Sequence, residues 1–500
     1  MVVQNGGSAT TGGVADRPIA GSLEELEQMV ARDLEILLYP QKPWMTPTPA
    51  PDGGQALDVA IVGGGHCGIA AAFALLQEKI SNILVLDEND PGEEGPWLTY
   101  ARMPDLRTRK TVIGMEHGYP NLTFRAYFEA REGLAAYAAM PRISCEDWVG
   151  YLMWMRKLLN LPVQNASRLK SLAPVGNLLR LTIDHAGREQ TLYARRVVLA
   201  TGPLAMGGAN IPPEVDGLPK EYWAHAYERI DVDALAGKRV AVVGGGATAF
   251  DNAGELLERG VASVDLLVRR PKLCRVSVIR WTDWAGFLHT FADLPDKERW
   301  DMMQMVQRNP APPTLRALER VDSNPDFRIH FSSPLLSTEL AGDGIEIATA
   351  SGTVAADFLI LGTGFSVDLS RCGFLGPILD DIALWRDRLP EAKSGGPEKY
   401  RNSPYLGRHY EFCEKLPGAA PYLKHIYNFN QTAQLSMGPT GRVSGLKYGV
   451  RRLMDGISGS FLKEDYGRHL ASVIAYNDSD MDGHPWVESP EDSRVEQAAE

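Results

Sequence analysis

Cysteine is scarce in this chain, and its few copies are widely scattered. The 500 residues contain five cysteines, and no two are closer in sequence than Cys372 and Cys413. There is no CxxC pair and no clustered set of zinc ligands, so we expect no metal site. An odd, scattered set of cysteines is typical of free thiols in a reducing compartment, which predicts a cytoplasmic protein.

Positive charge is also in short supply. Lys and Arg total 51 against 63 Asp and Glu, which gives a net charge of −12. Such a chain repels nucleic acid and anionic lipid, so we expect no nucleic-acid partner and no membrane-surface role. The net charge does not exclude a local basic pocket.

Long uninterrupted hydrophobic runs are absent as well. The most apolar stretch, residues 57–76, contains Asp58, His66 and three consecutive glycines, which a membrane-spanning helix tolerates poorly. Residues 1–20 have no apolar core of the kind found in signal peptides. We therefore expect neither a membrane span nor a secretory leader.

The composition that remains is that of a globular protein. Hydrophobic residues make up 44% of the chain and charged residues 23%, both near the average for globular proteins. Five hundred residues exceed one ordinary core, so two or three domains are expected.

The two ends of the chain differ from its middle. Residues 1–20 are rich in Gly, Ser, Thr and Ala and predict a flexible tail, and the acidic segment 476–500 predicts another. Residues 22–39 have Leu and Met at helical spacing, with Ser22 as the expected N-cap. The Pro-rich segment 40–54 predicts a linker.

The middle of the chain contains one internal repeat. In the first unit an apolar run, 58–62, precedes three glycines, a helix-like stretch to about 79 and a second apolar run, 82–86. In the second unit the run 238–243 precedes three glycines, a helix-like stretch to 259 and the run 263–268. Both units predict a strand, a glycine turn, a helix and a second strand.

The glycine turns carry the spacing of a dinucleotide site. The first glycine permits a tight turn, the second leaves room for a pyrophosphate, and the third lets the helix pack on the strand. The first unit meets this spacing with Gly63, Gly65 and Gly68. The second unit meets it with Gly244, Gly246 and Ala249, and the small residues Ala247 and Thr248 between them are also expected to contact the cofactor. We therefore predict two dinucleotide sites.

The ends of the second strands distinguish the two sites. Asp87 follows the first unit and suits the hydroxyls of an adenosine ribose. Arg269 and Arg270 follow the second unit and suit a ribose 2′-phosphate, which predicts NADPH there. The alternative is that the arginine pair is only a solvated end of a strand.

Taken together, these motifs resemble those of the class B flavoprotein monooxygenases, over about residues 57–455. Two further apolar segments that end in small turns, 196–202 and 357–365, match the family, as does Ile211–Gly217 between the units. The resemblance implies an α/β fold with two Rossmann-like domains, the NADPH domain inserted in the FAD domain. It also implies FAD and NADPH as cofactors, with Thr363 and Gly364 beside them.

The resemblance also implies domain boundaries. An N-terminal tail, helix and linker would occupy residues 1–56 and the first part of the FAD domain residues 57–203. The NADPH domain would span 204–361, and the chain would return to the FAD domain and substrate region over 362–475, before the acidic tail.

The family's subclasses are harder to separate. Trp97, Met103 and the run 122–127 resemble the N-hydroxylating members, in which a Lys-type residue contacts the substrate; Arg107 or Lys110 would take that place. The resemblance therefore implies a monooxygenase that uses O2 through a C4a-(hydro)peroxyflavin and N-hydroxylates a small amine or amino acid. Baeyer–Villiger oxidation and S-oxygenation stay open, because His225 survives from the Baeyer–Villiger signature and Arg269 could align with the arginine over its flavin.

Other motifs have both a functional and a structural interpretation. Asn430 lies in a late segment that resembles the family's loop returning to the flavin and substrate, although Asn is also common in turns. His66 and Cys67 are interpreted as fillers between required glycines. Trp281, Trp284 and Phe287 are expected in the core, with a substrate lining as the alternative.

Two other classes of protein compete with the monooxygenase. A disulfide reductase shares the glycine repeat but needs a redox cysteine pair, which the spacing excludes. A non-catalytic flavin-binding redox protein is not excluded. A homo-oligomer also remains open.

Overall fold

The computed structural model describes residues 19–37, 42–111, 113–308, 311–394, 396–478 and 480–481. Most of the predicted N-terminal tail and nearly all of the acidic tail lie outside these residues. The predicted N-terminal helix is α1, Leu23–Leu37, and the Ser22 hydroxyl accepts a hydrogen bond from the backbone N–H of Glu25 (3.2 Å). Ser22 is therefore the N-cap, as predicted.

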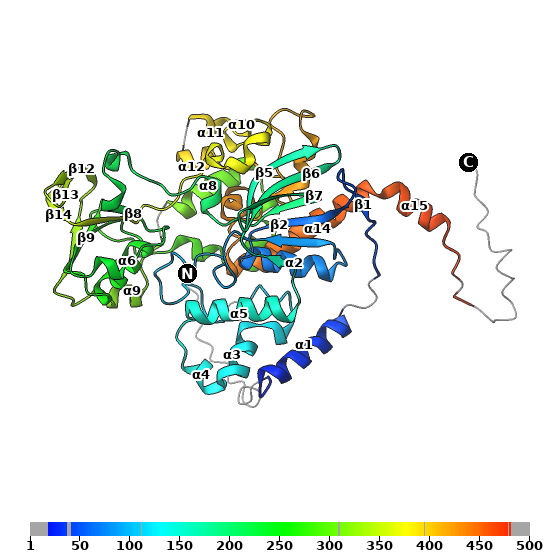
Figure 1. Cartoon of the computed structure of the whole chain (residues 1–500), viewed down its shortest axis with the longest axis horizontal. Helices are drawn as coiled ribbons and strands as arrows, with labels where there is room; N and C mark the ends of the chain where they lie inside the picture. The colour runs from blue at the N-terminus through cyan, green and yellow to red at the C-terminus, as the bar shows by residue number, and fades with distance from the viewer. Residues whose placement is uncertain are drawn as a thin grey trace, which may run out of the picture.

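The larger sheet has eight strands and forms the centre of the molecule (Figure 1). Its main path runs β4-β3-β2-β7-β6-β5, with β1 paired to β2 and β16 paired to β7. Strands β4, β3, β2, β7 and β16 run parallel, whereas β5, β6 and β7 form an antiparallel meander. The bounds are β1 Thr48–Pro49, β2 Gln55–Val62, β3 Ile83–Leu86, β4 Val163–Gln164, β5 Ser167–Val175, β6 Leu178–His185, β7 Arg188–Leu199 and β16 Ile426–Tyr427.

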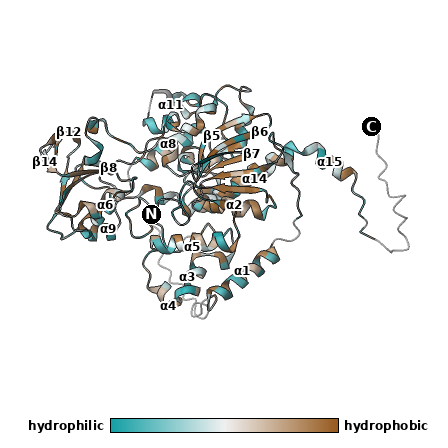
Figure 2. Ribbon diagram, in the orientation of Figure 1, coloured by the Kyte–Doolittle hydropathy of each residue, from teal (hydrophilic) through white to brown (hydrophobic). Residues whose placement is uncertain are grey.

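Helices cover this sheet because its central strands are apolar on both faces. From Asp58 to Val62 strand β2 is almost continuously buried, which is typical of a parallel strand between two layers. Helix α2, His66–Gln77, packs against β2, β3 and α14, Leu446–Glu464. Below them in Figure 1, α1 packs on α3, Phe124–Glu132, which in turn contacts α4, Leu134–Ala139, and α5, Cys145–Leu158. Figure 2 shows the hydrophobic strands enclosed in this way.

The smaller parallel sheet lies to one side and is built from an inserted segment of the chain. Its order is β11-β10-β9-β15-β8, and all its pairings are parallel. The strands are β8 Trp223–His225, β9 Arg239–Val243, β10 Ser263–Val268, β11 Phe327–Phe331 and β15 Phe358–Leu361. Helices α6, Ala247–Glu258, and α9, Leu315–Glu319, pack on each other beside this sheet. An antiparallel meander of β12 Leu335–Ala341, β13 Gly344–Thr349 and β14 Gly352–Ala356 flanks the sheet.

The order of strands confirms the predicted insertion. The chain leaves the larger sheet after β7, builds the smaller sheet, and returns at β16 and α14. Both predicted strand–turn–helix–strand units are present, as β2-α2-β3 and β9-α6-β10. The α/β fold with two Rossmann-like domains is therefore as predicted, while the residue numbers given for the domain boundaries stay a prediction.

Short helices from two stretches of the chain, residues 285–307 and 385–437, pack together. They surround a separate apolar cluster that includes Phe287, Phe291, Trp300 and Trp385. The helices are α7 Ala285–Thr290, α8 Asp296–Gln307, α10 Trp385–Arg388, α11 Pro390–Ser394, α12 Glu398–Arg401 and α13 Gln434–Met437.

Two buried arginines fasten the end of the chain's longest described helix to the sheet. Arg195 and Arg196, on β7, pair with Asp465 (2.9 Å) and Glu464 (2.5 Å) at the end of α14. Both guanidinium groups also lie 4.5 Å from the ring centroid of Phe461. Buried charges need such partners, so this cluster fixes α14 against the sheet that carries the first glycine turn.

Candidate functional site

The first glycine turn has the geometry that the spacing predicts. Gly63 adopts φ +109°, and a Cβ there would overlap the carbonyl oxygen of Ala200. A Cβ on Gly68 would overlap the carbonyl oxygen of Gly63, so only glycine lets the helix approach the strand this closely. At Gly65 the nearest atom to an added Cβ is 4.0 Å away, so space is open where a phosphate would lie.

The start of helix α2 is free to bind an anion. Gly65 is the N-cap, and it has no side chain to accept a hydrogen bond from the first turn. The N–H groups and the helix dipole therefore face the open space beside Gly65, an arrangement that favours a pyrophosphate. The residues present fit the diphosphate of FAD.

Asp87 lies against the same turn. Its Oδ2 accepts a hydrogen bond from the Gly64 N–H (2.7 Å), and its Oδ1 accepts from the backbone and side chain of Asn89 (2.8 and 3.0 Å). Asp87 thus holds the turn in shape, and its contact with a ribose stays a prediction.

A second carboxylate beside this turn was missed by the sequence analysis. Buried Glu94 accepts hydrogen bonds from Arg156 (2.7 Å), Asn165 (2.7 Å) and the Gly92 N–H (2.7 Å). No local sequence pattern predicts this network, because Arg156 and Asn165 lie 62 and 71 residues from Glu94 in the sequence.

Two residues predicted to contact the flavin flank the larger core. Trp97 packs edge-on to Trp148 (6.3 Å between ring centroids), and its buried Nε1 has no hydrogen-bond partner among the residues that the structure describes. Met103 packs against the core, and its carbonyl accepts a hydrogen bond from the Cys145 thiol (3.1 Å). Their contact with a flavin stays a prediction; the unpaired indole N–H is free for a cofactor atom.

The late segment returns to the first turn, as the resemblance implies. The carbonyl oxygen of Gly441 lies 3.2 Å from His66 Nε2 and accepts a hydrogen bond from the Cys67 thiol (3.4 Å). Burial lowers the pKa of His66 and raises the pKa of Cys67 to about 12, so Cys67 stays a thiol. Both residues therefore fasten the loop to the turn.

Asn430 has a structural position in this loop. Its Oδ1 accepts from the backbone and hydroxyl of Thr432 (2.9 and 2.7 Å), and its Nδ2 donates to Asn428 (2.6 Å). Nδ2 also reaches the Leu199 carbonyl and the Thr201 hydroxyl, each at 3.3 Å. The structure thus favours the turn-forming interpretation of Asn430 over direct substrate contact.

The second glycine turn repeats the first with different neighbours. Gly244 has φ +143°, and a Cβ there would lie 2.7 Å from the carbonyl oxygen of Gly362 and 3.0 Å from the Ala249 Cβ. Helix α6 begins after Gly246, which makes no side-chain cap. Ala247 and Thr248 form its first turn, although the Ala247 N–H already reaches the Ala311 carbonyl (3.3 Å).

The segment after β15 lies against the linker between the sheets. The Thr363 hydroxyl donates to the Asn210 carbonyl (2.5 Å), and the Asn210 N–H donates to the Gly364 carbonyl (2.9 Å). Gly364 has φ +84°, a backbone conformation that glycine adopts more readily than other residues. The two predicted cofactor residues thus define the crossing between domains.

Arg269 and Arg270 lie where the second strand of the repeat ends. Arg269 is exposed, whereas Arg270 is partly buried and its Nη1 lies 2.7 Å from the Cys274 sulfur. Of the two, Arg269 has the side chain better placed to bind a 2′-phosphate from solution.

Replacing Arg269 with alanine should raise the KM for NADPH by about 10- to 100-fold, because charge-assisted hydrogen bonds contribute about 1.5–3 kcal/mol. The KM for NADH, which lacks the phosphate, should change little. Steady-state kinetics with both coenzymes test this, with the exposed Arg275→Ala as the matched control. An equal rise for both coenzymes would show that Arg269 does not read the phosphate.

His225 is fully buried on β8. Its Nδ1 accepts a hydrogen bond from the Tyr227 N–H (3.2 Å), and its Nε2 has no partner. Burial, the main cause, lowers the pKa of His225 to about 4, so the ring is neutral near pH 7. A neutral ring at the C-terminal edge of the smaller sheet fits a cofactor or hinge contact better than a proton donor.

Arg107 and Lys110 are less open to a substrate than the resemblance implies. Arg107 pairs with Asp251 on α6 (2.5 Å), which joins the two domains. Lys110 donates to the carbonyls of Tyr137 (2.6 Å) and Ala138 (3.1 Å) at the end of α4. The structure therefore gives Lys110 a helix-capping role, although neither residue's contact with a substrate is tested.

The expectation of a core position is wrong for two of the three aromatic residues. Trp281 and Trp284 are 60% and 49% exposed, and only Phe287 is buried. The rings of Trp281 and Trp284 pack edge-on, with their centroids 5.8 Å apart. The alternative interpretation, a substrate lining, is the one that this exposure favours.

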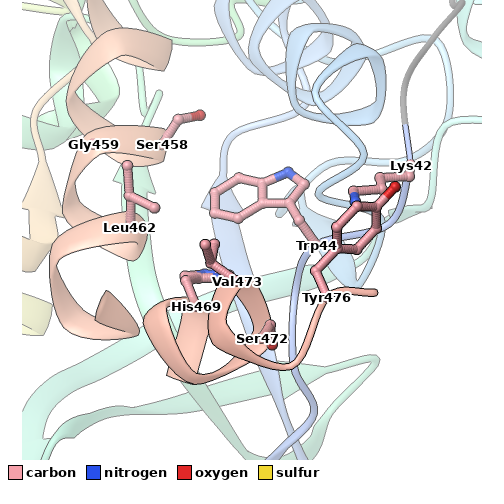
Figure 3. Close-up of a pocket in the computed structure, with 9 residues that line it drawn as sticks. All are labelled: Lys42, Trp44, Ser458, Gly459, Leu462, His469, Ser472, Val473 and Tyr476. Carbon is pink, nitrogen blue, oxygen red and sulfur yellow. The ribbon is translucent and has the colours of Figure 1, made fainter. Parts of the chain in front are cut away.

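An apolar cavity of about 730 Å³ lies elsewhere, between the N-terminal segment, α14 and α15, Tyr466–Ile474 (Figure 3). Trp44, Leu462 and Val473 line it, and none of the predicted cofactor residues does. In the part of the chain that the structure describes, no cluster of three metal-ligating side chains occurs. No helix there has both the length and the apolar character needed to cross a membrane.

Comparisons with known proteins agree with this geometry. The family model described as pyridine nucleotide-disulphide oxidoreductase matches residues 60–278, which include both glycine turns. None of the five cysteines, all within the described residues, forms a disulfide, so the match reflects the shared dinucleotide-binding fold.

Two curated relatives cover most of the chain. The FAD-dependent urate hydroxylase of Xanthomonas campestris pv. campestris is 37% identical over 466 residues, 92% of this chain and 98% of that protein. A Baeyer–Villiger monooxygenase of Pseudomonas aeruginosa is 25% identical and covers 73% of each chain.

Solved structures share the fold. The ornithine hydroxylase of Pseudomonas aeruginosa aligns with a TM-score of 0.64 at 19% identity, over 82% of this chain and 99% of that one. An ornithine N-hydroxylase of Kutzneria sp. 744, solved with reduced FAD, NADP⁺ and L-ornithine, aligns at 0.63 and 15% identity, over 81% and 99% of the two chains.

The two sheets, each with a dinucleotide turn, and the long match to a flavin-dependent hydroxylase confirm the predicted class, the flavin monooxygenases, and its oxidoreductase character. Within that class, the chain belongs to the family of the FAD-dependent urate hydroxylase. The comparisons do not decide between the subclasses that the sequence left open.

Proposed function

We propose that the protein is an FAD- and NADPH-dependent monooxygenase that hydroxylates urate or a closely related anionic purine with O2. The observation that carries this proposal is the 37% identity to a urate hydroxylase over nearly the full length of both chains. Bound FAD, reduced by NADPH, supplies the chemistry that activates oxygen.

Two separate parts of the chain would hold the two cofactors. Gly63, Gly65 and the start of α2 would bind the FAD diphosphate, and Gly244, Gly246 and the start of α6 would bind that of NADPH. The inter-domain pair Arg107–Asp251 joins the segment after Trp97 to α6, and so would keep the nicotinamide domain in place.

N-hydroxylation of a small amine or amino acid, which the sequence predicts, is the second candidate. The observation in its favour is that Leu106, Leu122 and Phe124, from the segment carrying that resemblance, pack in the same core as the first turn. Lys110, however, is occupied by two carbonyls. Urate therefore remains the leading substrate. Baeyer–Villiger oxidation, S-oxygenation and a non-catalytic role are the further candidate functions.

The test is NADPH oxidation with urate, L-ornithine, cyclohexanone and thioanisole in turn, with product masses measured. Urate should stimulate NADPH oxidation at least about tenfold and gain one oxygen, because a site built for its polar edges rejects molecules that lack them. Oxygenation of ornithine but not urate would replace this function with N-hydroxylation. No NADPH oxidation at all would favour a non-catalytic flavoprotein.

The cytoplasmic location, the lack of a nucleic-acid partner and the oligomeric state stay predictions.

A further inference from the structure

One arginine in the late loop, Arg442, forms no ion pair with any described residue. Arg442 directly follows Gly441, whose carbonyl contacts His66 and Cys67 of the first glycine turn. The next residues, Val443–Gly445, form a short 3₁₀ turn that leads into α14. Arg442 therefore lies next to the turn that would hold the FAD diphosphate.

The guanidinium group of Arg442 is poorly compensated. Its Nη1 is shielded from solvent without a hydrogen-bond partner, and among the described residues no carboxylate forms an ion pair with it. Burial and the charges of Arg107 and Arg280 lower the pKa of Arg442, and Asp283 opposes them. Arg107 is paired with Asp251 through its Nη2, but its buried Nε has no hydrogen-bond partner among the described residues. Such a cluster is stabilised when an anion binds.

Exposed aromatic rings accompany this cluster. The Ser444 hydroxyl donates to Asp283 (2.9 Å), which brings the segment carrying Trp281 and Trp284 to the loop. Both tryptophans are about half exposed, although large apolar side chains are usually covered. A flat ring system stacks well on such surfaces and on arginine.

We propose that Arg442, supported by Arg107 and Arg280 and flanked by Trp281 and Trp284, forms a binding subsite for a planar anion. This inference rests on the proposed function and deepens it: the occupant is the urate monoanion, which is both flat and negatively charged at neutral pH. The guanidinium group binds the anionic edge, and the tryptophans cover a face of the ring.

The diphosphate of FAD and the phosphates of NADPH are the other sources of negative charge near this cluster. The contacts of the loop disfavour NADPH, because Gly441 touches the first turn, at His66 and Cys67, rather than the second turn, at Gly244–Gly246. FAD is distinguished from urate by the flavin content of the variant. The experiment must separate the three anions.

The experiment uses the full-length, FAD-loaded protein with Arg442→Gln, and with the exposed Arg451→Gln as the matched control. Urate and NADP⁺ are each titrated against the oxidised enzyme, and binding is followed by the change in flavin absorption. Arg442→Gln should weaken urate binding by about 10- to 100-fold, the loss expected for charge-assisted hydrogen bonds, and leave NADP⁺ binding within about twofold. The control should bind both as the unaltered protein does.

Each other outcome overturns the inference in a distinguishable way. Weaker NADP⁺ binding with unchanged urate binding would assign Arg442 to the coenzyme. Unchanged binding of both with a reduced FAD content would assign Arg442 to the FAD diphosphate, and unchanged binding of both with full FAD content would remove Arg442 from any anion site, while the proposed function stands. If the unaltered protein binds and oxidises no urate, the proposed function and this inference fail together.

A conservative variant keeps the test informative if Arg442→Gln loses its flavin. Arg442→Lys retains the charge but not the forked geometry, so it should hold FAD and show an intermediate loss of urate affinity. Full urate affinity in Arg442→Lys, with full affinity also after Trp281→Ala, would contradict the subsite.

Discussion

Replacing Gly68 with alanine is expected to yield a protein without bound flavin. The added Cβ would overlap the carbonyl oxygen of Gly63, a backbone atom that cannot move without opening the turn. Overlap with a backbone atom places the cost at the upper end of the range for overpacking, about 3 kcal/mol or more. The distortion falls where the FAD diphosphate would bind, so FAD affinity should fall by at least about 100-fold.

The flavin absorption of the purified variant measures this loss. Gly459→Ala is the matched control, because an added Cβ there meets nothing within 4 Å. That control should remain yellow with one FAD per chain. A yellow Gly68→Ala protein with full FAD content would mean that binding of the FAD diphosphate does not depend on this turn.

Replacing Gly244 with alanine should separate the two cofactors. The new Cβ would lie 2.7 Å from the Gly362 carbonyl oxygen, and Gly244 also has φ +143°, which L-residues rarely adopt. The second turn should therefore distort while the first keeps its flavin. We expect the rate of flavin reduction by NADPH to fall at least about 100-fold, since a small displacement of a bound reactant has effects of that size.

Anaerobic rapid mixing of the FAD-loaded variant with NADPH measures the reduction rate. Gly373→Ala, with open space around the added Cβ, serves as the control. Dithionite should still reduce the flavin in Gly244→Ala, which shows that the flavin site is intact. Normal reduction by NADPH would argue that the coenzyme binds elsewhere.

The sequence predicts the two turns well because each depends on neighbouring residues. The spacing of Gly63, Gly65 and Gly68 is local, and the atom that forbids a side chain at Gly68 belongs to the same turn, although the one at Gly63 belongs to the distant Ala200. The apolar runs on either side specify buried parallel strands for the same reason.

The side chains that shape the substrate region depend on distant partners. The carbonyls that bind Lys110 lie 27 and 28 residues away, and the loop that meets His66 lies 375 residues away. Helical spacing also predicts the wrong environment for Trp281 and Trp284, because periodicity cannot tell a buried face from an exposed one near a domain junction. Arg442 has no sequence motif, and only its missing partner in the folded chain draws attention to it.

The central claim is that one chain holds FAD at its first glycine turn and NADPH at its second. Its most direct test is an anaerobic titration of the purified, unaltered protein with NADPH, followed by flavin absorption. The account predicts one FAD per chain, bleached completely by about one equivalent of NADPH, because each two-electron donor reduces one flavin. A protein that takes up no FAD, or whose bound FAD keeps its colour under excess NADPH, would contradict it.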